Sequence, residues 1–114
     1  MPTSNADADN KKAIADTFFT LDRNFSKLYA ACTTDAERAQ LTALRDGARD
    51  TFWAAQAKSL ADSHEVVVQL REQLNAANNQ VAGQLQGLIQ IVQVLKLIAE
   101  AVKTAAALAS LAAA

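Results

Sequence analysis

Residues that interrupt helices are scarce in this chain of 114 residues, which has one proline, Pro2, and three glycines. A β-rich fold needs turn residues about every ten positions, and this sequence does not supply them. Helices need long stretches without proline and glycine, and such stretches make up most of the chain. Because the length suits one domain better than two, we expect a single all-α domain.

A second cysteine and an excess of one charge are also missing. Cys32 has no partner for an internal disulfide, which fits a reducing compartment. The 11 basic and 12 acidic residues are interspersed, so no basic stripe follows a phosphate backbone, and we expect no nucleic-acid partner. The polar start, 1–10, lacks the features of a secretory signal. We therefore expect a cytoplasmic protein, or one exported without a cleaved signal peptide.

Apolar residues recur at helical spacing from about residue 10, after a polar lead, 1–9, that we expect to be disordered. Thr34 and Glu37 have the spacing of a capping box, which predicts the start of a second helix near residue 35. All six aromatic residues precede residue 54, and we expect them to tie the first helix to the first half of the second. The first helix is predicted over 10–32 from one apolar seam: Ile14, Phe18, Leu21, Phe25, Leu28 and Cys32.

The second helix is expected over 35–77, with a kink or break near 60 as the alternative. Asn78-Asn79 is the expected turn, because asparagine tolerates left-handed backbone angles. The last helix, over 80–112, carries two adjacent apolar seams with the 3.5-residue period of a coiled coil. The sequence thus predicts an antiparallel helical bundle of three main helices in a single domain, 10–114.

Chemical motifs are as scarce as helix breakers. Asp62 precedes the only histidine, His64, by two positions and could not face it from the same helix. Cys32 ends an apolar seam, where burial as a small hydrophobe is the expected role. Asp46 and Asp50 share a helical face, but adjacent arginines oppose a cation there, so we expect an ion-paired surface. No catalytic, phosphate-binding or zinc-binding motif is present, and we expect no enzyme activity, no cofactor and no metal.

The strongest signal lies at residues 88–98, where eight of the eleven side chains are large and apolar. Their arc is wider than the ~100° stripe that a surface helix buries. If a three-helix monomer left four of them exposed, the burial forgone would be ~6–12 kcal/mol, comparable to the stability of a whole domain. We therefore predict that this helix is covered by another molecule, through an interface of Leu85, Leu88, Ile91, Val92, Val94, Leu95, Ile98, Val102, Ala105 and Leu108.

Two classes of function follow from such a helix. In the first, the chain is a non-enzymatic protein–protein interaction or assembly subunit that forms a homo-oligomer or binds a helical partner. In the alternative, it is a membrane-active, pore-forming or translocator-like protein that inserts the hairpin 66–98. The absence of charge over 73–95 suits insertion, whereas Lys96, Glu100 and Lys103 oppose it. A third alternative, a small inhibitor or immunity-type protein, is supported only by size.

Overall fold

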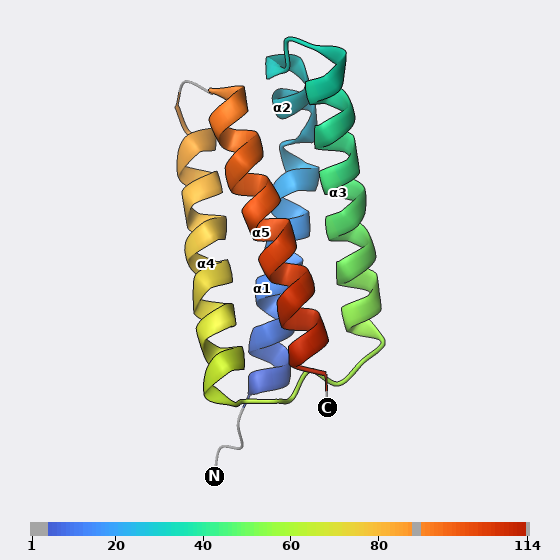
Figure 1. Ribbon diagram of the computed structural model, residues 1–114, viewed down its shortest axis with the longest axis vertical. Coiled ribbons are helices and arrows are strands. Elements are labelled where there is room, and N and C mark those ends of the chain that lie inside the picture. The colour runs from blue at the N-terminus through green and yellow to red at the C-terminus, as the bar shows by residue number, and fades with distance from the viewer. Residues whose placement is uncertain (1–4, 88–89, 114) are drawn as a thin grey trace.

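The computed structural model describes residues 5–87 and 90–113, which form five α-helices (Figure 1). The helices are α1 (Ala6–Arg23), α2 (Phe25–Ala31), α3 (Asp35–Gln56), α4 (Glu65–Leu85) and α5 (Ile91–Leu111). In Figure 1 the four long helices lie side by side, and α2 continues α1 at one end of the bundle. No strand occurs within the described ranges, so the all-α class predicted from the sequence is confirmed.

Over the described residues, the bundle has four long helices where the sequence predicts three main ones. The expected helix 35–77 is divided into α3 and α4 by the linker 57–64, at the place given as the alternative break near 60. The last helix begins at Ile91 rather than at residue 80. At the other end of the chain, the disordered lead expected over 1–9 is too long, because α1 begins at Ala6. Residues 1–4 of that lead lie outside the described residues.

Asn78 lies inside α4, so the predicted Asn78-Asn79 turn is wrong. Its side chain is buried and satisfied by α1: Nδ2 donates to the Ala13 carbonyl at 3.1 Å, and Oδ1 accepts from the Thr17 hydroxyl at 2.9 Å. These two hydrogen bonds join α1 to α4 inside the core, where an unpaired amide would cost ~1–3 kcal/mol. This tertiary contact outweighs the local preference of asparagine for a turn.

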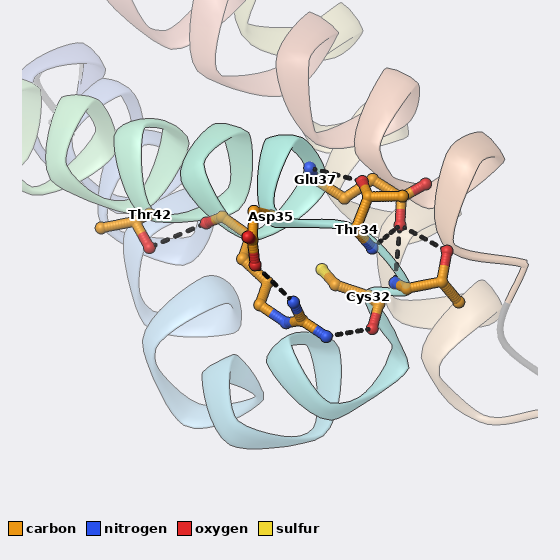
Figure 2. A network of polar contacts seen from close by, with 7 residues as sticks. Cys32, Thr34, Asp35, Glu37 and Thr42 are labelled. Atoms are coloured by element: carbon orange, nitrogen blue, oxygen red, sulfur yellow. Dashed lines mark hydrogen bonds and ion pairs between the residues drawn. The ribbon is translucent and has the colours of Figure 1, made fainter.

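The turn between α2 and α3 has the capping box that the sequence predicts (Figure 2). Thr34 Oγ1 accepts from the Glu37 backbone N–H at 3.1 Å, and Glu37 Oε1 accepts from the Thr34 N–H at 3.3 Å. Glu37 also accepts from the Thr33 N–H at 2.7 Å. The backbone N–H of Thr33 is the largest of the effects that lower the pKa of Glu37. The cap thus fixes the point where the chain reverses.

The linker 57–64 crosses the end of the bundle where α1 begins and α5 ends (Figure 1). Its anchor is Leu60, whose side chain is 0% exposed. The Asp7 carboxylate accepts from the Leu60 N–H at 2.7 Å, and the Asn10 amide donates to the Leu60 carbonyl at 2.8 Å. The Asp62 N–H donates to the Ala112 carbonyl at 3.3 Å. The first turns of α1 therefore fix the linker that separates α3 from α4.

Asp7 makes this anchor sensitive to acid. The Leu60 N–H holds the pKa of the Asp7 carboxyl below its ordinary value of 3.8, with a smaller contribution from Lys11. A group with a lowered folded-state pKa stabilises the fold above its unfolded pKa, and this stabilisation is lost as pH falls through the folded pKa. We expect the melting temperature of the wild type to fall more steeply than that of Asp7→Asn between about pH 5 and pH 2. Parallel curves for the two proteins would contradict this assignment.

The helix α5 lies against α1, α3 and α4, which together cover its apolar side. Of its large apolar residues, Val92 and Leu111 are exposed, and the rest of the water-facing surface is polar or small. A bundle of only three helices would leave part of α5 in need of a covering molecule. In this bundle the fourth long helix supplies the missing cover. One predicted seam lies wholly in the core: Ile91, Val94, Ile98, Ala101, Ala105, Leu108 and Ala112.

Candidate interaction surface

The ten residues expected to form an interface on the C-terminal helix do not form one surface. Leu88 lies outside the described residues. Val92 is 58% exposed and Val102 is half-buried. A partner could reach the other seven only if the bundle opened, because they are buried within this chain: Leu85, Ile91, Val94, Leu95, Ile98, Ala105 and Leu108.

The charge-free stretch 73–95 follows the same division between core and water. Within it, Leu74, Val81 and Val94 face the core, whereas Gln73 and Asn79 face solvent. Apart from the exposed Val92, the water-facing residues described within this stretch are therefore amides and small residues. Over the described residues, every helix falls short of the combined length and hydropathy that a membrane-crossing span needs.

The reactive side chains singled out in the sequence lie in separate elements: Cys32 follows α2, Asp46 and Asp50 lie in α3, and His64 lies in the linker before α4. In the described part of the chain, no three histidine, cysteine, aspartate or glutamate residues are arranged to hold a metal ion. Cys32 is buried as expected, its thiol donates to the Leu28 carbonyl at 3.4 Å, and burial is the main cause that raises its pKa.

His64 and Asp62 are in contact, contrary to the expectation from helical spacing. Asp62 Oδ1 accepts from the His64 backbone N–H at 2.8 Å and lies 3.0 Å from ring atom Nδ1. The expectation is wrong because both residues lie in the linker before α4, where helical geometry does not separate their side chains. The His64 N–H is the main cause that lowers the pKa of Asp62. The imidazole is 87% exposed, so this pair forms a turn on the surface.

Four aromatic rings form a continuous row from the core to the surface between α1 and α3. Phe18 is buried, and its ring centroid lies 5.5 Å from that of Phe52. The Phe52 ring in turn meets Phe19 and Trp53 edge-on, each at 5.1 Å between centroids. Phe19 is 37% exposed and Trp53 is 63% exposed. We call Phe19, Phe52 and Trp53 the aromatic ridge.

Helical geometry explains why the aromatic ridge reaches the surface. Successive side chains on an α-helix diverge by about 100°, so two adjacent aromatic residues cannot both face the core. In α1, Phe18 faces inward and Phe19 outward; in α3, Phe52 turns toward α1 and Trp53 toward water. Phe52 lies in the first half of the predicted helix 35–77, so the predicted aromatic tie between the first helix and the second is confirmed, at the C-terminal end of α3.

Charged side chains of both signs surround the aromatic ridge. The Arg23 guanidinium carbon lies 5.9 Å from the centroid of the Phe19 ring, within the range of a cation–π contact. One turn before Trp53, Arg49 lies 3.7 Å from both Asp46 and Asp50, which confirms the expected ion-paired surface. Ion pairs this long and this exposed contribute ~0–1 kcal/mol, so the charges remain available to a partner.

An exposed tryptophan among arginines has the composition of a protein-binding hot spot. Isolated exposed apolar residues are ordinary, but a connected group with a charged rim is typical of an interaction site. This surface was not predicted from the sequence, in which the apolar run in the last third is the stronger signal. The available signal was Trp53, which lies on the side of its helix opposite Ala48 and Ala55.

Comparison of the chain with known protein families, curated proteins and solved structures finds no match.

Proposed function

We propose that this chain is a non-enzymatic protein–protein interaction module, an assembly subunit that makes contact through the aromatic ridge of α1 and α3. The observation that carries the proposal is Trp53, which is 63% exposed while its ring packs on Phe52. The class of function is the one expected from the sequence. The contact surface moves from α5 to α1 and α3, because most of the expected α5 residues are needed inside the bundle.

The energetics of the ridge support this role. Full burial of a large apolar side chain contributes roughly 1.5–3 kcal/mol, and most of that contribution is still unused at Trp53. The indole already packs edge-on against Phe52, and a side chain that packs on a neighbour before binding loses less freedom on binding. Arg23 and Arg49 at the rim can hydrogen-bond to carboxylates on a partner.

The proposal is tested by replacing Trp53 with a photoreactive benzoylphenylalanine and irradiating the cells that express the chain. The matched control carries the same group at Glu72, an exposed position on α4. We expect a covalent protein adduct from position 53 and none from position 72, with the partner identified by mass spectrometry. The absence of an adduct at position 53, or equal adducts from both positions, would rule out the ridge as the contact surface.

A further inference from the structure

One stripe of α3 faces away from the rest of the bundle and carries the exposed tryptophan of the aromatic ridge. The opposite side of α3 packs on α1 and α5 through Leu41, Ala48 and Ala55, each at most 2% exposed. In Figure 1, α3 and α4 lie at opposite edges of the bundle, so the outward stripe of α3 is open along its length. The stripe consists of Ala39, Thr42, Ala43, Asp46, Arg49 and Trp53, all exposed or partly exposed.

We propose that the molecule bound at this stripe is a second copy of the chain, docked through α3 in the antiparallel direction. The inference rests on the proposed function, because the stripe includes Trp53 of the aromatic ridge and the proposal names the partner. A two-fold contact of this kind must be complementary to itself. Each positive residue must therefore meet a negative one when the helix is reversed onto its own copy.

The order of charges in α3 meets this requirement. Reversal about a point between residues 47 and 48 places Asp46 opposite Arg49 of the second copy, and Arg49 opposite Asp46 of that copy. Arg45 takes no part in this contact, because its guanidinium carbon lies 3.9 Å from the centroid of the Phe25 ring on α2. Within one chain the Asp46–Arg49 and Arg49–Asp50 pairs are both 3.7 Å apart, so the charges are only loosely engaged. Complementary charges at an interface fix its register.

The same register gives Trp53 a place to bind. A side chain that packs on a neighbouring helix inserts among four residues of that helix, at positions i, i+3, i+4 and i+7. The four that surround Trp53 in this register are residues of the second copy with mostly small side chains: Ala39, Thr42, Ala43 and Asp46. The two alanines leave room for the indole. Asp46 offers an acceptor for its N–H, which donates to no group within the described chain.

The expected dimer is weak. One helix of 22 residues is about 33 Å long, and a single pair of such helices buries less than the ~800 Å² per partner of a typical stable complex. We therefore expect a dissociation constant in the micromolar range, with sedimentation of the full chain changing from monomer to dimer between ~1 and ~300 µM. A chain that stays monomeric over this range would overturn the inference.

Charge exchange between two copies gives the decisive test. Arg49→Asp and Asp46→Arg should each weaken the dimer at least tenfold, because like charges then face each other across the two-fold axis. An equimolar mixture of the two variants should form a heterodimer at the same protein concentration at which the wild type forms its dimer. Mixing cannot repair an ion pair within one chain, so recovery reports only the contact between copies. Glu72→Arg, on α4, is the matched control and should leave the dimer unchanged.

Each remaining outcome has a defined meaning. Trp53→Ala removes an exposed side chain, so this variant should fold, and the dissociation constant of its dimer should rise at least tenfold. Circular dichroism checks the fold of every variant. A dimer that tolerates Trp53→Ala, or variants that show no heterodimer on mixing, would overturn this arrangement.

If the chain is monomeric but photoreactive position 53 captures an identified different protein, the proposed function stands and the second copy is excluded. If position 53 captures nothing, both proposals fail together.

Discussion

Replacement of Leu60 by alanine should lower the free energy of unfolding by about 2–5 kcal/mol, although Leu60 lies in a linker rather than a helix. Its side chain is 0% exposed and belongs to the apolar cluster that includes Leu74 and Leu108. Removal of its outer carbons leaves a cavity that the surrounding helices can only partly close. The expected loss is a large fraction of the ~5–15 kcal/mol that stabilises a typical domain.

Urea unfolding followed by circular dichroism measures this loss. The matched control is Val66→Ala, close to the linker in the first turn of α4, where the side chain is 58% exposed. We expect that variant to unfold within about 0.5 kcal/mol of the wild type. Similar effects at the two positions would show that Leu60 does not anchor the linker in the core.

Local signals in the sequence predict the parts of this fold that depend on neighbouring residues. The capping box of Thr34 and Glu37 gives the start of α3 correctly, because both partners lie within one helical turn. The apolar seam from Ile14 to Cys32 gives the inward face of α1 and α2. The all-α class follows from the shortage of proline and glycine.

Contacts between distant residues explain what the sequence did not show. Whether residues 57–64 continue a helix depends on Asp7 and Asn10, about fifty positions away, which bind the backbone of Leu60. Whether Asn78 ends a helix depends on α1, which supplies its hydrogen-bond partners. The first error reduced the number of long helices in the described ranges from four to three, and the second moved the start of the last helix from residue 91 to residue 80. The missing helix then made α5 look uncovered and directed the site prediction to residues that lie in the core.

The aromatic ridge needed the same long-range information. Phe18, Phe19, Phe52 and Trp53 are visible in the sequence as two adjacent pairs, and helical periodicity shows that each pair divides between core and surface. Periodicity does not show that the two outward residues meet across neighbouring helices. The packing of α1 on α3 brings the Phe19 and Phe52 rings to 5.1 Å and so makes one surface of them.

Leu95→Asp should unfold the chain, and this variant separates a buried α5 from an α5 that forms an interface. Leu95 is 3% exposed and lies in the cluster with Leu41 and Ile98. An aspartate there loses its hydration without gaining a partner, a cost of several kcal/mol that adds to the lost apolar burial. The sum is comparable to the stability of the domain, so the helical circular dichroism signal should be lost at neutral pH.

Val92→Asp is the matched control, because Val92 lies one turn earlier on the same helix and is 58% exposed. An acidic residue in the first turn of a helix is favoured by the helix dipole, so this variant should stay folded. Sedimentation of Leu95→Asp tests the alternative, in which α5 forms an interface between copies. A helical, folded monomer derived from an oligomeric wild type would mean that Leu95 contacts another copy. That result would return the interface to α5 and remove the reason for placing it on the aromatic ridge.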